Sequence, residues 1–137
     1  MLRKHMATIS KEHYPEKALT IFTIVGSAGR EEMLQVVDNL TDEERTPNII
    51  WDATDGTVGG MHYRDIKYIA EKIRGGHGSR ADGRTGLVAG TALDYGMARM
   101  FATYASIKGL SVRYKCFRAL GDAVDWIDQM NRSHHKD

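Results

Sequence analysis

The sequence contains a single cysteine, Cys116, among 137 residues, so no disulfide can form within the chain. None is needed, because a domain of this length buries roughly two thirds of its unfolded surface without a covalent or metal staple. Tyr114 and Phe117 flank the cysteine and are typical of a strand. We therefore expect a buried structural thiol rather than a reactive one.

Long hydrophobic runs are also lacking, and no segment approaches the roughly 18 apolar residues of a membrane span. The first residues, Met1 to Met6, include Arg3 and Lys4, but no apolar stretch follows as it would in a signal peptide. These features predict a cytoplasmic protein with no membrane span.

Neither sign of charge is in excess, since 19 basic side chains face 18 acidic ones and the net charge is +1. Nucleic-acid-binding domains are usually clearly basic, and membrane-surface helices carry basic stripes. We therefore expect neither kind of partner. The fractions of hydrophobic (42%) and charged (27%) residues are those of an ordinary globular protein, and the length predicts one domain over residues 1–137.

What the sequence does contain is an alternation of β-branched runs with amphipathic stretches. Short runs rich in Val, Ile, Thr and aromatic residues, bounded by turn residues, predict strands. They cover Thr8 to Tyr14, Leu19 to Val25, Asn48 to Asp52, Thr85 to Ala89 and Leu110 to Phe117.

Four stretches have apolar residues at helical spacing. Their apolar positions are Met33, Val36, Val37 and Leu40; Ile66, Ile69, Ala70 and Ile73; Leu93, Met97, Met100, Phe101 and Tyr104; and Leu120, Ala123, Val124, Ile127 and Met130. Thr91 with Asp94 three residues on has the residue types of a helix cap. The tail from Asn131 is expected to be frayed.

The resulting order is β-β-α-β-α-β-α-β-α. Strands separated by helices pair in parallel through right-handed crossovers, and the two first strands form an antiparallel edge. We predict an α/β fold with a small, open, mostly parallel sheet of about five strands and four helices.

Ligands of such sheets bind beyond the carboxyl ends of the strands. Asp52 and Asp55 flank the loop there and suit either a metal or acid–base chemistry, or they close the turn and cap the next helix. Turn closure is the favoured interpretation. An enzyme using both with His62 lacks a recognised nucleophile or cofactor loop, so we expect no enzymatic activity.

Two glycine loops are weaker candidates. Residues 26–29 offer backbone N–H groups to an anion or simply make a tight strand-to-helix turn, which is favoured. Residues 75–84 are locally basic, and His77 there and His62 would face a common ligand or lie in solvent, which is favoured. The six histidines have no metal-site spacing, so no metal or cofactor is expected.

A fourth candidate is the apolar stripe of Met97, Met100, Phe101 and Tyr104. Such a stripe is usually core, and it also lines any cavity between its helix and the sheet.

The chain resembles the SpoIIAA-like group within the STAS-like fold (sulfate transporter and anti-sigma-factor antagonist domains) over about residues 6–130. The resemblance rests on Ile49-Ile50-Trp51-Asp52, on Tyr95-Gly96-Met97-Ala98-Arg99-Met100, and on Val112 to Phe117 followed by Ala123-Val124-Asp125-Trp126-Ile127.

The resemblance implies a non-enzymatic regulatory module that binds another protein or a second copy of itself. Anti-sigma-factor antagonists are switched by phosphorylation of a serine at the start of the helix after the central strand. Here that region reads Asp55 to Met61, without the Asp-Ser pair, and Thr57 is the nearest hydroxyl. The expected binding loop comprises Asp52, Asp55, Thr57, Gly59, Gly60 and His62.

SpoIIAA-like sequences also look related to the CRAL-TRIO lipid-binding fold. That likeness implies an alternative function, a carrier that holds a small lipophilic ligand between the third helix and the sheet.

Overall fold

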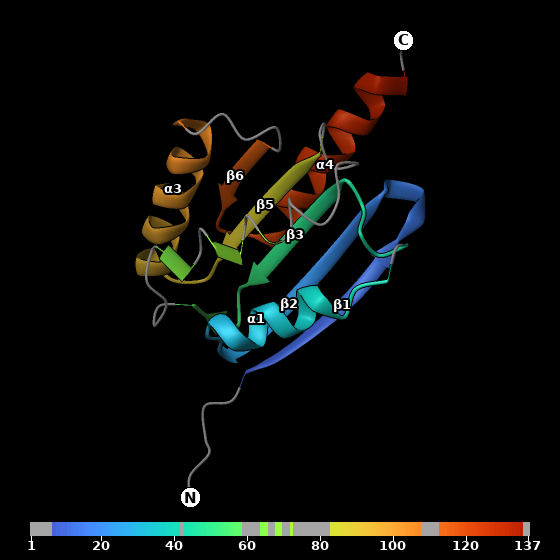
Figure 1. Cartoon of the computed structure of the whole chain (residues 1–137). Coiled ribbons are helices and arrows are strands. Elements are labelled where there is room, and N and C mark those ends of the chain that lie inside the picture. Colours follow the sequence, from blue (N-terminus) through green and yellow to red (C-terminus); the bar gives the residue numbers. More distant parts are fainter. Residues whose placement is uncertain are drawn as a thin grey trace, which may run out of the picture.

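The computed structural model describes residues 7–41, 43–58, 64–65, 68–69, 72, 83–107 and 113–135 (Figure 1). Its strands are β1 (Thr8–Tyr14), β2 (Leu19–Ser27), β3 (Asn48–Ala53), β4 (Gly56–Thr57), β5 (Arg84–Ala89) and β6 (Arg113–Phe117). Its helices are α1 (Arg30–Asp38), α3 (Ala92–Ile107) and α4 (Leu120–His135), with a 3-10 turn η1 (Pro15–Lys17). The order of elements predicted from the sequence is confirmed for these segments.

The sheet has the order β1-β2-β3-β5-β6. β1 and β2 pair antiparallel, and every further pair along this path is parallel, as predicted. The antiparallel pair follows from the tight η1 turn, because a short connection cannot carry the chain back for parallel pairing. Strands of the parallel part therefore end at one common edge.

One strand was not foreseen. β4 lies in the segment predicted as a flexible loop, residues 54–60, and pairs with the end of β2. Its position is held by Gly26 N–H donating to the Asp55 carbonyl and Ala28 N–H donating to the Thr57 carbonyl. A Cβ at Gly56 would lie 2.4 Å from the Ile24 carbonyl oxygen, so only glycine allows this approach. Two residues are too few to show any periodicity in sequence.

The helix boundaries differ from the expectations at two points. α1 ends at Asp38, and Leu40 lies beyond it, although its side chain is still buried in the same cluster. α4 continues to His135 through the tail expected to be frayed. In the predicted second helix the described residues 64, 65, 68, 69 and 72 are helical, and the rest lies outside the described residues.

The helices cover both faces of the sheet, α1 and α3 one face and α4 the other (Figure 1). Alternate residues of the central strands supply two separate clusters, because successive side chains of a strand point to opposite faces. Ile49 and Trp51 belong to the cluster on the α1 side, and Ile50 to the one on the α4 side. β3 is buried along its whole length, as its continuous apolar run predicts.

Within the part of the chain that the structure describes, no helix is long and apolar enough to cross a membrane.

Candidate functional site

The two carboxylates of the loop after β3 lie in different environments. Asp52 is buried, and its Oδ1 accepts hydrogen bonds from the Thr54 backbone N–H (3.0 Å) and the Thr54 hydroxyl (2.6 Å). Asp55 is exposed at the tip of the turn. This arrangement is that of a carboxylate closing its own turn, which is the interpretation favoured from the sequence.

Thr57, the candidate phosphorylation site, is half-buried in β4, with its backbone in register with Ser27 of β2. Gly59, Gly60 and His62, the other members of the expected binding loop, lie outside the described residues, as do residues 75–82 of the basic glycine loop predicted over residues 75–84. Among the described residues, no group of three His, Cys, Asp or Glu side chains is placed to hold a metal.

The backbone N–H groups of the turn after β2 are occupied within the protein. Gly26 N–H and Ala28 N–H donate to β4 and the turn before it, and Gly29 N–H donates to the Glu32 carboxylate at 2.7 Å. Glu32 is the third residue of α1, and its contact with the N–H of the N-cap residue Gly29 is the one that the acidic residue makes in a capping box. An anion would have to displace these contacts, so the geometry favours the tight-turn interpretation.

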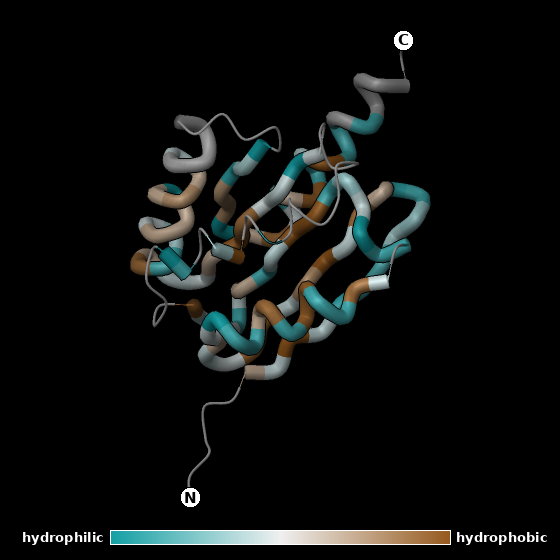
Figure 2. The backbone as a smooth tube through the Cα atoms, viewed as in Figure 1, coloured by the Kyte–Doolittle hydropathy of each residue, from teal (hydrophilic) through white to brown (hydrophobic). Residues whose placement is uncertain are grey.

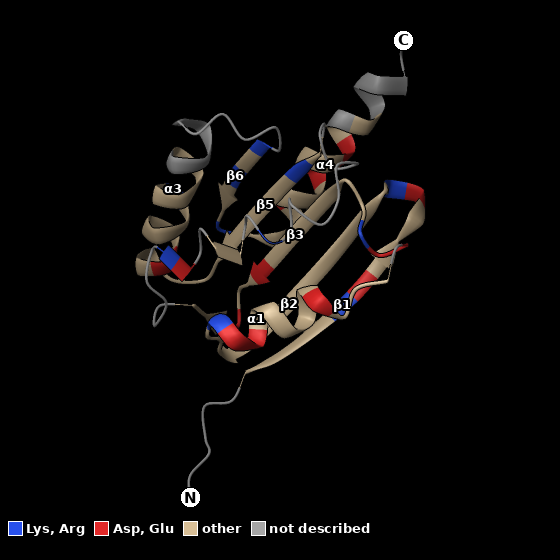
Figure 3. Ribbon diagram, in the orientation of Figure 1, with Lys and Arg blue, Asp and Glu red and all other residues tan. Residues whose placement is uncertain are grey.

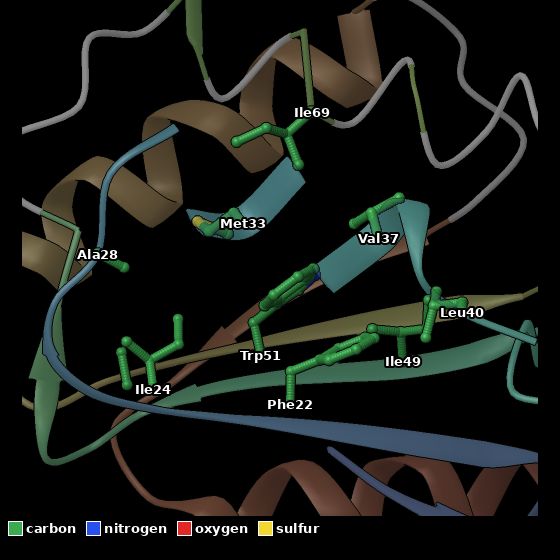
Figure 4. Packing of buried hydrophobic residues seen from close by; sticks show 10 residues of the cluster. Phe22, Ile24, Ala28, Met33, Val37, Leu40, Ile49, Trp51 and Ile69 are labelled. Carbon is green, nitrogen blue, oxygen red and sulfur yellow. The ribbon is translucent and has the colours of Figure 1, made fainter. Parts of the chain in front are cut away.

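A cavity of about 100 Å³ lies between the sheet, α1 and α3. Figure 4 shows four of its lining residues, with Ile24 and Trp51 rising from the sheet toward Met33 of α1 and toward Ile69. From α3 the lining residues are Asp94, Met97, Ala98 and Phe101. Steps of three and four residues place these four on one face of the helix.

The cavity includes only part of the apolar pocket predicted from the sequence. Met97 and Phe101 line it. Met100 was predicted to do so as well, and this is wrong: its side chain is 62% exposed. At about 100° per residue, Met100 lies beyond the Met97 edge of this lining stripe and turns away from the sheet, whereas Phe101 lies near the middle of the stripe. The Tyr104 side chain lies outside the described part of the chain.

Asp94 is the residue that the sequence reasoning assigned to a cap and that the structure places in the cavity wall. The hydroxyl half of the cap is confirmed, because Asp94 N–H donates to Thr91 Oγ1 at 3.1 Å. The prediction that the Asp94 carboxyl group takes part in the cap is wrong. The Asp94 carboxyl group is 3% exposed, and neither oxygen has a hydrogen-bond partner among the described residues. The sequence did hold a signal for this position, because Asp94 is spaced three and seven residues from Met97 and Phe101 and so shares their face of the helix.

The single thiol is a poor nucleophile. Burial raises the pKa of Cys116 to about 11, and the nearby Arg99 guanidinium only partly opposes this effect. Cys116 pairs in register with Leu87, so both side chains lie on the cavity side of the sheet. A thiol that stays protonated at neutral pH matches the structural role expected for it.

No protein-family model matches the sequence, and a search of curated proteins gave no match. Solved structures do match. One is the crystal structure of an uncharacterized DUF3478-family protein with a SpoIIAA-like fold from Shewanella loihica PV-4. The TM-score is 0.56 at 19% identity, covering 93% of this chain and 98% of that chain.

The second is an anti-sigma factor antagonist from Mycobacterium paratuberculosis, with a TM-score of 0.52 at 10% identity, covering 93% of this chain and 99% of that chain. At these identities the likeness defines the fold. The chain has a SpoIIAA-like fold over nearly its whole length, which confirms the resemblance seen in the sequence at the level of architecture.

Proposed function

We propose that this protein is a non-enzymatic regulatory module that acts by binding another protein through the outer face of α3. The observation that carries the proposal is the composition of that face. The exposed side chains on the described part of α3 are Ala92, Leu93, Gly96, Arg99, Met100 and Thr103. A single cation stands among small and apolar residues.

A surface helix normally opposes its apolar stripe with a charged face. α1 obeys this rule with Arg30, Glu31 and Asp38 exposed, and Figure 2 shows its brown and teal alternating while α3 is mostly brown to white. Figure 3 likewise shows charges along α1 and little charge along α3. A helix that is apolar on two sides is expected to have protein on both.

Leu93 and Met100 are the two most exposed large hydrophobic side chains in the described part of the chain, with exposed fractions of 69% and 62%. They are seven residues apart, which places them two turns apart on one side of the helix. Isolated surface hydrophobics are ordinary, but a repeated pair on a face with a single charge, Arg99, is typical of a docking stripe. Gly96 between them lets a partner helix approach closely.

The partner that fits is a protein segment with an apolar face and an acidic side chain opposite Arg99. The fold likeness supports a protein partner, since one solved relative in fold is named for antagonism of an anti-sigma factor, itself a protein. A second copy of this chain is the other occupant to be tested.

The alternative function, a carrier for a lipophilic molecule, is less well supported. Pockets for drug-sized ligands measure roughly 300–1,000 Å³. The cavity beneath α3 is about 100 Å³, which leaves no room for a long acyl chain.

The test places a charge in the middle of the α3 face. A Cβ at Gly96 meets no atom within 4 Å, so Gly96→Glu is expected to fold. Gly121 on α4 is equally unobstructed, and Gly121→Glu is the matched control. Both variants, and the wild type, are used as tagged baits in lysate of the native host, with quantitative mass spectrometry of the captured proteins. Sedimentation equilibrium of each purified bait reports self-association.

We expect a protein whose recovery falls about tenfold with Gly96→Glu and is unchanged with Gly121→Glu, because a buried unpaired charge is strongly unfavourable. Charge reversal at Arg99 should weaken the same capture. A dimer lost only in Gly96→Glu would identify a second copy as the occupant. Equal capture by all baits, or loss with both glutamate variants, would overturn the docking role of α3.

A further inference from the structure

The inner face of α3 carries a second feature that protein docking on its outer face leaves unexplained. The cavity under this face is walled largely by aliphatic and aromatic side chains, among them Ile24, Trp51 and Phe101. Asp94 places a carboxyl group in that wall. Both carboxyl oxygens are fully buried, with no hydrogen-bond partner in the described structure.

Three helices in the described part of the chain carry an acid at their third position, and among these three acids only Asp94 has this environment. Glu32 reaches back to the Gly29 N–H. Asp122 of α4 is exposed to water. Aspartate is one methylene shorter than the glutamate of a capping box, so the Asp94 side chain is poorly suited to repeat the contact that Glu32 makes.

The Asp94 backbone cannot easily move its side chain out of the cavity wall. Its N–H donates to Thr91 Oγ1, and the Tyr95 N–H donates to the Thr91 carbonyl at 3.0 Å. Leaving a buried polar group without a partner costs about 1–3 kcal/mol. Buried polar groups are nearly always satisfied, so an exception calls for a missing donor.

Water alone is a poor candidate for that donor. A buried water makes about three hydrogen bonds and needs two to four polar partners. Besides Asp94, the cavity lining has two hydroxyl-bearing side chains, Thr85 and Tyr114, and each of them already has an interaction partner within the protein. A ligand with a hydrogen-bond donor on an apolar body would match both the Asp94 carboxyl group and the apolar side chains of the lining.

We propose that this cavity is a binding site for a small aliphatic amine, whose ammonium group donates to the Asp94 carboxylate while its hydrocarbon body occupies the apolar space. The volume sets the size of the ligand. An apolar cavity of about 150 Å³ accepts benzene, so about 100 Å³ accommodates a body of four or five carbons. Carboxylate-to-ammonium hydrogen bonds are about twice as strong as neutral ones.

Three probes of equal shape test the proposal: isobutylamine, isobutanol and isobutyrate, each titrated into ¹⁵N-labelled full-length protein and followed by NMR. We expect saturable shifts at α3 and β5 residues with isobutylamine, about tenfold weaker binding of isobutanol, and none of isobutyrate. The amine is expected to raise the melting temperature in a concentration-dependent way.

Variants separate a built site from weak nonspecific binding. Asp94→Asn keeps the shape and should weaken isobutylamine binding about tenfold, whereas the matched Asp122→Asn at the exposed third position of α4 should leave it unchanged. Ala98→Ile keeps the carboxylate and fills the space, and should also abolish binding. Equal binding of the three probes, or retention of amine binding in both Asp94→Asn and Ala98→Ile, would overturn the proposal.

The site and the docking face lie on different sides of α3, so the two proposals fail separately. Loss of partner capture in Gly96→Glu says nothing against amine binding, which is measured on the purified chain alone.

Discussion

The two apolar layers of this protein are built from the same strands yet differ in how completely they are filled. On the α4 side, Ile50, Ala123 and Ile127 are fully buried, and a Cβ added at Gly86 would lie 3.4 Å from Ala123 and from Ile50. On the α1 and α3 side, a cavity of about 100 Å³ remains, and the carboxyl group in its wall has no hydrogen-bond partner among the described residues.

The difference follows from what each helix brings to the sheet. α4 presents small Ala123 above Gly86, so the helix approaches closely and leaves no space. α3 presents Asp94 and Ala98 toward larger residues of the sheet and does not fill the gap between them. Protein interiors are otherwise packed as densely as organic crystals. We therefore expect the α4 layer to contribute more to stability, while the proposed amine site lies in the α3 layer.

The largest expected effect is removal of a fully buried side chain from the filled layer. Ile50→Ala should lower the free energy of unfolding by about 4 kcal/mol, because it removes apolar contacts and leaves a hole. Met97→Ala, at a half-buried position beside the existing cavity, should cost about 1–2 kcal/mol. Urea unfolding measures both, and equal losses would contradict the contrast between the layers.

Adding volume should have opposite signs on the two sides. Gly86→Val is expected to destabilise by about 2 kcal/mol, since its methyl groups would overlap Ala123 and Ile50. Ala98→Val extends into the cavity and should stabilise by about 0.5–1 kcal/mol. Thermal unfolding of the two variants measures these changes, and destabilisation by Ala98→Val would show that the cavity beneath α3 cannot take the added methyl groups.

A smaller effect is expected at Asp94. Asp94→Leu should raise the free energy of unfolding by about 1 kcal/mol, because the gain from removing a buried unpaired group exceeds the lost interaction with the helix dipole. Asp122→Leu, at the equivalent exposed position, should change it by less than about 0.5 kcal/mol. A loss of stability in Asp94→Leu would indicate that the carboxyl group has a favourable partner in solution.

At neutral pH the smallest change in stability is expected from the Cys116 thiol. Its pKa is raised to about 11 by burial, so the folded state holds this proton more tightly than the unfolded chain does. The stabilisation is therefore complete below the ordinary thiol pKa and is lost as the pH rises from about 9 through about 11. Alkylation at pH 8 should be on the order of 100-fold slower than that of a free thiol. Labelling at the rate of the unfolded protein would contradict the burial.

Much of the architecture was readable because its signals are local. Each strand of the main sheet path coincides with a β-branched run, and the short turn at Pro15 specifies the antiparallel edge. β4 was missed because its pairing with β2 comes from hydrogen bonds to the β3–β4 turn and from the close approach that Gly56 permits. Contacts of that kind have no period in sequence.

The candidate site was read less well, for a reason that Asp94 and Met100 illustrate. Helical spacing correctly placed Met97 and Phe101 together, but the width of the inner stripe depends on how α3 sits over β5 and β6. That placement buries Asp94 and exposes Met100. In addition, a polar residue at the start of a helix is most simply interpreted as part of a cap, and the Thr91 hydroxyl does accept a capping hydrogen bond.

The sequence by itself determined the alternation of strands and helices and the buried central strand, since periodicity and turn chemistry act over a few residues. Its resemblance to the SpoIIAA-like group came from the motifs around Trp51, Gly96 and Trp126. Only the tertiary structure decided which face of α3 meets the sheet, how much space remains beneath it, and that the acid at its third position is buried with no partner in the described part of the chain. Those properties depend on the packing of elements distant in the chain, and they carry the two proposed binding surfaces.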